Sequence, residues 1–352
     1  MKSYKIACVP GDGIGNEVVP ESLKVLDTVA VQCGFKLNFE HYDYSCEHYV
    51  KHGKMMPEDG LDRLRDNDAI FLGAVGYPGV PDHVSLWGLL IPIRRTFQQY
   101  VNLRPVRLLE GVSSPLKSPG NVDFYIVREN NEGEYSSSGG RIYQGTKNEV
   151  VVQESIFTRN GVDKVMKYAF ELANKRGKRL TSATKSNGII HTMPFWDERF
   201  ADIGKAYPNI ETSQYHIDIL AAHFVQHPDW FDVVVASNLF GDVLSDLGPA
   251  VVGGMGIAAG ANLNPEKTYP SMFEPVHGSA PDIAGKNVAN PIACFWTAKL
   301  MLDHLGETEG ANLLMSSIED TLKEGSITTR DLGGTASTQD MTNAILKSLQ
   351  TK

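Results

Sequence analysis

Short apolar runs that end at glycine or a small polar residue, each followed by a helical pattern, recur along this chain. Tyr4 to Pro10 runs into a glycine turn and then a helix, and Ala69 to Gly76 is a second such run. Val233 to Ala236 is a third, and the helix that follows it carries two aspartates. Strands that alternate with helices predict a doubly wound α/β fold with a parallel sheet, in which ligands bind at the carboxyl ends of the strands.

The chain has 352 residues and a formal net charge of −9. Its length favours about two domains. The negative charge argues against a nucleic-acid or anionic-membrane partner. An anionic substrate would therefore need a local positive pocket, which makes clustered arginines informative.

Cysteine usage and the N-terminus bear on the compartment. The four cysteines, Cys8, Cys33, Cys46 and Cys294, form no CxxC pair and no zinc spacing. This pattern indicates free thiols in a reducing compartment. The first residues lead straight into a strand without an apolar signal region, and no run of about 18 apolar residues could span a membrane. We therefore expect a cytoplasmic protein.

The helix after the third apolar run carries the first candidate site. Asp242 and Asp246 are four residues apart, so on a helix they share one face. Two like charges at this spacing repel each other unless a cation lies between them, and a hard divalent cation takes carboxylate oxygens. An ordinary solvated acidic face is the alternative. We expect Ser237 or Asn238 to cap this helix.

The first glycine turn is not a standard dinucleotide fingerprint. Gly11, Gly13 and Gly15 follow a GxGxG spacing, whereas the Rossmann motif needs GxGxxG. A strand, a glycine turn and a helix N-terminus still allow close approach to an anion or cofactor. A simple tight turn between strand and helix is the alternative.

Eight polar residues at the ends of predicted elements have the chemistry to bind a small dicarboxylate together with Mg²⁺ or Mn²⁺. Arginine forks bind carboxylates, aspartates bind hard cations, and lysine and tyrosine can move protons. The eight residues are Arg94, Arg104, Arg128, Tyr135, Lys185, Asp218, Asp242 and Asp246. We expect Arg95, next to Arg94, to form a surface ion pair, and Asp218 by itself would also suit a helix N-cap.

Together with two longer motifs, these residues resemble the β-decarboxylating dehydrogenases of the isopropylmalate/isocitrate dehydrogenase family nearly end to end. The motifs are residues 11–17 and 274–282. The resemblance implies a two-lobed doubly wound fold rather than a standard Rossmann domain. It implies a large cofactor-binding lobe of residues 1–98 plus 252–352. Residues 99–251 would form a smaller lobe with the metal-binding and catalytic residues and the dimer contacts.

The resemblance also assigns roles residue by residue. Arg94, Arg104 and Arg128 would bind substrate carboxylates, Lys185 and Tyr135 would be the catalytic pair, and Asp218, Asp242 and Asp246 would bind the metal. The cofactor would contact Ile14, Glu274, His277, Gly278, Ser279, Ala280, Asp282 and Asn290. Lys185 and Asp218 would come from the partner chain, so the implied active unit is a homodimer with shared sites.

Asp282 bears on the choice of nicotinamide. Its carboxylate can accept hydrogen bonds from a ribose with a free 2′-hydroxyl and would repel a 2′-phosphate, so we expect NAD. A turn residue after Pro281 is the alternative. The choice between Mg²⁺ and Mn²⁺, and a requirement for a monovalent cation such as K⁺, stay open.

The segment from Tyr77 to Gly88 resembles the tartrate/D-malate dehydrogenase (decarboxylating) subfamily. Trp87 would fill the space that an isopropyl group on substrate C3 needs, unless it serves packing alone. The implied reaction is NAD-dependent oxidation of D-malate or tartrate, with β-decarboxylation of D-malate to pyruvate and CO₂. 3-Isopropylmalate dehydrogenase is the alternative within the family.

Two other classes remain as alternatives. A metal-dependent phosphoester enzyme could use the aspartates but leaves Asp282 and the three arginines unexplained. The other class is a non-catalytic regulatory subunit. We expect such a relative to lack Lys185, Tyr135 or a metal aspartate, and all of these are present here.

Overall fold

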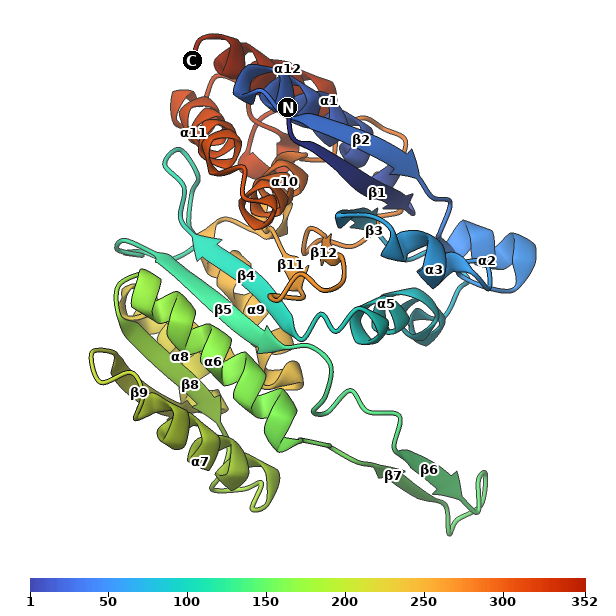
Figure 1. Ribbon diagram of the computed structural model, residues 1–352, viewed down its shortest axis with the longest axis vertical. Coiled ribbons are helices and arrows are strands. Elements are labelled where there is room, and N and C mark those ends of the chain that lie inside the picture. Colours follow the sequence, from blue (N-terminus) through green and yellow to red (C-terminus); the bar gives the residue numbers. More distant parts are fainter.

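A single ten-stranded sheet runs through the computed structural model, which describes residues 1–352 (Figure 1). Its strands lie in the order β2-β1-β3-β12-β11-β4-β5-β10-β8-β9. They are β1 (Ser3–Gly11), β2 (Lys36–His41), β3 (Ala69–Ala74), β4 (Val101–Arg107), β5 (Asp123–Glu129), β8 (Arg179–Thr184), β9 (Glu211–His216), β10 (Val233–Ala236), β11 (Ala261–Leu263) and β12 (Ser271–Phe273). Strands from residues 1–98 and 252–352 fill one half of the sheet, and strands from residues 99–251 fill the other.

The sheet is mixed, which corrects the prediction of a parallel sheet at its centre. β2, β1, β3 and β12 are parallel to one another, and so are β5, β10, β8 and β9. Between these flanks, β11 pairs antiparallel with β12 and β4, and β4 pairs antiparallel with β5. The chain between β11 and β12 is short, and only antiparallel neighbours can be joined by so short a connection.

Helices cover both faces of the first half of the sheet. One face carries α1 (Gly15–Cys33), α10 (Ile292–Leu305), α11 (Thr308–Glu324) and α12 (Thr338–Gln350), and the other carries α2 (Cys46–His52), α3 (Gly60–Arg65), α4 (Asp82–Ser85) and α5 (Ile91–Thr96). Alternate residues of β1 therefore join two cores, with Ile6 and Cys8 in the larger and Ala7 and Val9 in the smaller. A strand buried on both faces needs apolar side chains throughout, which explains its continuous apolar run.

The second half is covered in the same way. Helices α6 (Arg159–Lys175) and α7 (Thr192–Gly204) lie on one face, and α8 (Ile217–Gln226) and α9 (Asn238–Val252) lie on the other (Figure 1). Thr158 caps α6, because its hydroxyl accepts a hydrogen bond from Gly161 N. Short 3₁₀ turns complete the chain at η2 (Pro228–Trp230), η3 (Met255–Ile257) and η4 (Arg330–Leu332).

A two-stranded antiparallel hairpin extends away from this body (Figure 1). Its strands are β6 (Gly139–Ile142) and β7 (Val150–Gln153), and every residue of both is exposed. Ile142, Val150, Val151 and Val152 thus place apolar side chains in solvent. Exposed apolar surface of this kind marks an interaction site.

The first glycine turn brings three segments together. Gly11 has a φ of +74°, and a Cβ there would lie 1.9 Å from the carbonyl oxygen of Ala74. Gly13 has a φ of +55°, and a Cβ there would lie 2.1 Å from the carbonyl oxygen of Ser279. Only glycine fits both positions, so the turn packs directly on β3 and on the segment that contains Ser279.

Residues 82–96 are helical throughout, with Pro92 among them. A π-helical turn, η1 (Leu86–Leu90), joins α4 to α5. Pro92 lies in the first turn of α5, where a missing N–H costs little. Single π turns inside helices are frequent at functional sites.

The four cysteines are free thiols, as predicted from their spacing. None of the helices combines the length and the apolar character needed to cross a lipid bilayer.

Candidate active site

The three predicted arginines come from three adjacent elements. Arg94 lies in the last turn of α5, Arg104 on β4 and Arg128 on β5, and all three are buried. Arg94 and Arg104 line a small cavity of about 170 Å³ together with Glu274 and His277. The structure therefore gathers positive charge at one place in a chain whose net charge is negative.

Glu274, which the sequence placed among the cofactor residues, contacts the arginines. Arg94 Nη2 donates to Glu274 Oε1 at 2.7 Å, and both side chains are 8% exposed. Burial by itself would raise the pKa of the Glu274 carboxyl, but Arg94 and Arg104 outweigh it and hold the pKa below its usual range. One carboxylate thus offsets part of the charge of two arginines.

Two guanidinium donors of the arginines that line this cavity have no partner. Arg94 Nε and Arg104 Nη1 are buried without a hydrogen bond. Burial lowers the pKa of Arg104 to about 10, which still leaves it charged at neutral pH. Buried charged donors are almost always satisfied in proteins, so the two orphaned atoms indicate a place for an anion.

Asp242 joins the third arginine to the predicted catalytic tyrosine. Arg128 Nη1 donates to Asp242 Oδ1, and the Tyr135 hydroxyl donates to Asp242 Oδ2 at 2.5 Å. Burial would raise the pKa of Asp242, but Arg128 and Tyr135 lower it overall. Burial, with Asp242 as acceptor and neighbouring charge, raises the pKa of the Tyr135 phenol to about 12. Tyr135 is therefore held as a protonated acid at neutral pH.

Asp246 lies on the same helix as Asp242 and has no hydrogen bond or ion pair. Burial, and next the charge of Asp242, raise the pKa of its carboxyl. An exposed, unpaired carboxylate beside a second one fits a divalent cation, which would remove the repulsion. Within one chain no cluster of three metal-ligating side chains forms.

Lys185 and Asp218 lie apart from these residues. Lys185 follows β8, Asp218 lies in the first turn of α8, and Lys185 Nζ donates to Asp218 Oδ1 at 2.7 Å. This bond lowers the pKa of the Asp218 carboxyl. Asp218 is inside α8 and is not its N-cap, which is His216. Neither Lys185 nor Asp218 contacts Tyr135 or Asp242 through a hydrogen bond in the same chain.

Five of the eight predicted cofactor residues line a second cavity of about 500 Å³. Its lining includes Ile14, His277, Ala280, Asp282 and Asn290, together with Gly256, Arg330 and Asp331, which the sequence did not single out. The Ile14 amide donates to the carbonyl oxygen of Ser279 at 2.8 Å, which attaches the glycine turn to this loop. His277 lines both cavities, and Gly278 lines the one with the arginines.

Buried asparagines hold the arginines in place, and sequence reasoning missed them. Arg104 Nε donates to Asn102 Oδ1 at 2.6 Å, and the Asn102 amide donates to Asn262 Oδ1 at 2.8 Å. Asn262 in turn donates to Glu274 at 2.9 Å, and Asn238 accepts two bonds from Arg128. The available signal was an amide side chain inside apolar strands, since a buried amide needs partners.

Trp87 lies on η1 and is 37% exposed. The guanidinium of Arg95 lies 5.1 Å from the centre of its ring. Arg95 forms no ion pair, contrary to the expectation from sequence; its Nη2 donates to the backbone carbonyl of Tyr135 at 2.7 Å.

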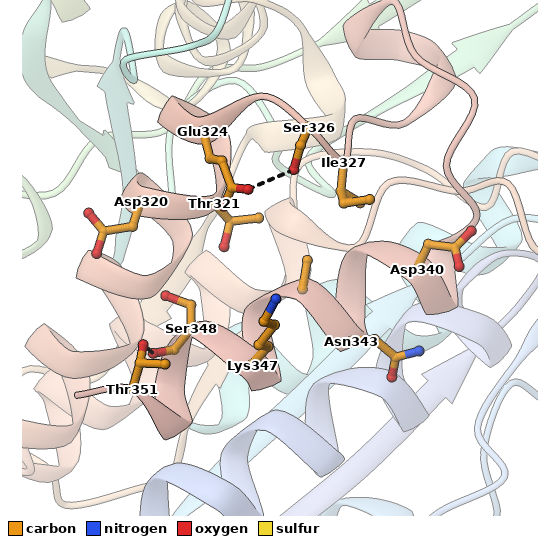
Figure 2. Close-up of a pocket in the computed structure, with 11 residues that line it drawn as sticks. Asp320, Thr321, Glu324, Ser326, Ile327, Asp340, Asn343, Lys347, Ser348 and Thr351 are labelled. Atoms are coloured by element: carbon orange, nitrogen blue, oxygen red, sulfur yellow. Dashed lines mark hydrogen bonds between the residues drawn. The ribbon is translucent and has the colours of Figure 1, made fainter.

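A hollow larger than either of these cavities lies elsewhere, between α11 and α12, with a volume of about 570 Å³. Its lining is mostly polar and includes Asp320, Glu324 and Lys347 (Figure 2). None of the predicted site residues lines it. Size alone would therefore misplace the active site.

Comparisons with known proteins show which family the chain resembles over its whole length. A family model described as isocitrate/isopropylmalate dehydrogenase matches residues 5–345. The chain is 57% identical to the D-malate dehydrogenase [decarboxylating] of Escherichia coli, over 99% of each chain. It is 54% identical to the tartrate dehydrogenase/decarboxylase of Pseudomonas putida, over 99% of this chain and 98% of that one. The crystal structure of isocitrate dehydrogenase from Methylococcus capsulatus superposes with a TM-score of 0.87 at 32% identity, covering 99% of each chain.

Proposed function

The chain belongs to the isocitrate/isopropylmalate dehydrogenase family, and we propose that it oxidises a 2-hydroxy dicarboxylic acid, D-malate or tartrate, with NAD and a divalent metal. With D-malate the reaction would continue by β-decarboxylation to pyruvate and CO₂. The observation that carries the proposal is the cavity with two orphaned arginine donors beside the Tyr135–Asp242 hydrogen bond. The names of the two relatives at 57% and 54% identity support this reaction.

The arginines would bind the substrate. The free donors Arg94 Nε and Arg104 Nη1 suit the carboxylate that leaves as CO₂, because a guanidinium binds a carboxylate through more than one N–H. The cavity volume of about 170 Å³ suits a small diacid. Arg128 already forms an ion pair with Asp242 and would orient the carboxylate of Asp242.

Asp242 and Asp246 would hold the metal, Mg²⁺ or Mn²⁺, with Asp218 as a third ligand. The unpaired Asp246 beside Asp242 supports this assignment. A bound divalent cation would polarise the C2 oxygen of the substrate. A monovalent cation such as K⁺ is a further candidate requirement that the substrate assays can include.

A homodimer would complete the site. Lys185, the proposed base on the C2 hydroxyl, and Asp218 contact each other and not Tyr135, which supports their supply by a second subunit. The exposed apolar residues Ile219, Leu239 and Val243 lie on α8 and α9, beside Asp218 and Asp242. A second copy covering this face would bury them.

NAD would occupy the cavity of about 500 Å³, with Asp282 facing the adenosine ribose. NAD supplies the hydride acceptor. We also propose the division into a cofactor-binding lobe of residues 1–98 plus 252–352 and a lobe of residues 99–251. The boundary follows the junction of β11 with β4 in the sheet order.

Each step of the reaction would use residues of the protein itself. Lys185 removes the proton of the C2 hydroxyl as hydride leaves C2, and the arginines hold the carboxylate at C3. The C3–C4 bond then breaks, CO₂ leaves, and the electron pair stays on the enolate. Tyr135 donates one proton to C3, and its phenol carries that proton at neutral pH because its pKa lies well above 7.

A turnover panel tests the proposal. Purified enzyme is assayed for NADH formation with D-malate, the tartrate isomers, 3-isopropylmalate and isocitrate, with Mg²⁺ or Mn²⁺, with and without K⁺, and with NAD or NADP. We expect D-malate or a tartrate with NAD to give the highest kcat/KM. Preferred turnover of 3-isopropylmalate would favour the alternative within the family. No turnover with any diacid would favour a non-catalytic regulatory subunit.

A further inference from the structure

We propose that Arg95 is a positioning residue that holds Tyr135 against the substrate carbon faced by Trp87. Its guanidinium donates to the Tyr135 carbonyl at 2.7 Å and lies 5.1 Å from the centre of the Trp87 ring. This inference rests on the proposed function, in which Tyr135 protonates C3, and on the expectation from sequence that Trp87 fills the space beside C3. Arg95 would then set both groups around the same carbon atom.

The neighbouring arginines have different partners, which separates their roles. Arg94 forms a buried ion pair with Glu274, and Arg128 forms an ion pair with the partly exposed Asp242. Arg95 has no carboxylate partner, and its two contacts are a backbone carbonyl and an aromatic face. An arginine with these two contacts positions the groups that it touches, since its guanidinium is rigid and stacks on aromatic rings.

The π turn explains how Arg95 reaches Trp87. In an uninterrupted α-helix, residues eight apart lie roughly 80° from each other around the axis. The turn η1 contains Trp87 and holds more residues than an α turn, so it rotates Arg95 back towards the face that carries Trp87. The irregular helix geometry is therefore what allows one side chain to touch both Trp87 and Tyr135.

Tyr135 needs support from outside its own segment. It lies between β5 and β6 in irregular chain, close to one isolated bridge from Gly133 to Ile156. Its hydroxyl is held by Asp242 and its backbone by Arg95. Arg95 belongs to the proposed cofactor lobe and Tyr135 to the other lobe, so this hydrogen bond also fixes the two lobes relative to each other near C3.

Loss of Arg95 should act on proton transfer and not on hydride transfer. Hydride leaves C2, whereas Tyr135 delivers its proton to C3 after the C3–C4 bond has broken and CO₂ has left. The phenolate then regains a proton from solvent. A displacement of about 1 Å can reduce a rate by about 100-fold, so the proton step would limit turnover in a variant that lacks Arg95.

The test compares Arg95→Ala, Arg95→Gln and Arg95→Lys with the full-length enzyme, using D-malate, NAD and Mn²⁺. Primary isotope effects are measured with D-malate deuterated at C2, and solvent isotope effects in D₂O. For Arg95→Ala and Arg95→Gln we expect kcat to fall about 10- to 100-fold, the solvent isotope effect to rise and the primary effect to fall. KM for NAD should stay within about twofold, because Arg95 does not line the cofactor cavity. Arg95→Lys, which keeps a cation and one donor, should restore most of kcat.

The control is Arg107→Ala, which removes a surface ion pair to Glu319 and should leave all parameters unchanged. Arg95 variants with wild-type kcat and isotope effects would overturn the inference. So would a fall in kcat with both isotope effects unchanged, because that result indicates general damage. If Arg95→Ala does not fold, the Gln and Lys variants decide by the same measurements. Absence of D-malate turnover by the wild-type enzyme would instead count against the proposed function.

Discussion

The carboxylate of Glu134 accepts a hydrogen bond from the backbone N–H of Leu239 at 3.0 Å and another from the Ser237 hydroxyl at 2.8 Å. Ser237 is the N-cap of α9, yet its side chain makes no capping bond to the helix. The helix that carries Asp242 and Asp246 is therefore capped by the residue next to Tyr135. A negative carboxylate at this end also interacts favourably with the helix dipole.

Replacing Glu134 with Ala should destabilise the protein by about 1–2 kcal/mol, because the first turn of α9 loses its cap. Glu134→Gln keeps an acceptor oxygen and should lose less. Free energies of unfolding from urea titrations check this. The matched control is Glu110→Ala, which removes an exposed ion pair to Lys323 and should change stability by less than about 0.5 kcal/mol. Equal effects at positions 110 and 134 would contradict the capping role.

Replacement of Arg94 and replacement of Arg104 should have different effects on stability. Arg94→Met leaves the buried Glu274 without its ion pair, so we expect a loss of about 3–5 kcal/mol in stability as well as activity. Arg104→Met removes a buried charge with an unpartnered donor, so stability should change little while kcat/KM falls about 10- to 100-fold. Thermal unfolding and steady-state kinetics of both variants decide. A larger stability loss for Arg104→Met than for Arg94→Met would refute this reading of the cavity.

Glu129 predicts a pH dependence of stability. It is buried on β5, accepts hydrogen bonds from the Asn131 and Glu132 amides, and burial raises the pKa of its carboxyl from 4.5 to about 7. A carboxyl whose folded pKa is raised stabilises the fold fully below its unfolded pKa and loses that contribution as pH rises through the folded pKa. The wild-type protein should thus lose up to about 3 kcal/mol from this group between about pH 4.5 and pH 7.

Glu129→Gln should remove this slope, because an amide does not ionise. Urea unfolding of both proteins at several pH values between 4 and 8 measures it. The difference between the two curves isolates Glu129 from all other titrating groups. A constant difference across this range would show that Glu129 does not titrate there.

The sequence predicted local features well and contacts between distant segments poorly. The strand from Val233 to Ala236 and the helix after it were confirmed, because an apolar run followed by a capping residue is a local signal. The antiparallel centre of the sheet was missed because strand direction depends on connections that a run such as Ala261–Leu263 does not reveal. At the site, residue types suggested the arginines and aspartates, but not the Asn102–Asn262 network or the Arg95 contact, which depend on tertiary packing.

Asp246→Asn should change stability in opposite directions with and without metal. Without metal, Asp246 is an unpaired, exposed carboxylate near Asp242, so its neutralisation should stabilise the protein by about 0.5 kcal/mol. With Mn²⁺ at about 100 times the Kd, the wild-type protein should gain about 2.7 kcal/mol, and the variant, which lacks a ligand, should gain far less. Thermal unfolding with EDTA and with Mn²⁺ measures both changes, and Asp66→Asn, on the exposed surface, is the control.

Equal Mn²⁺ stabilisation of wild type and Asp246→Asn would exclude Asp246 as a ligand. A destabilised metal-free variant would show instead that Asp246 has a structural partner, so the sign of the metal-free change separates a site built for a cation from an ordinary acidic helix face.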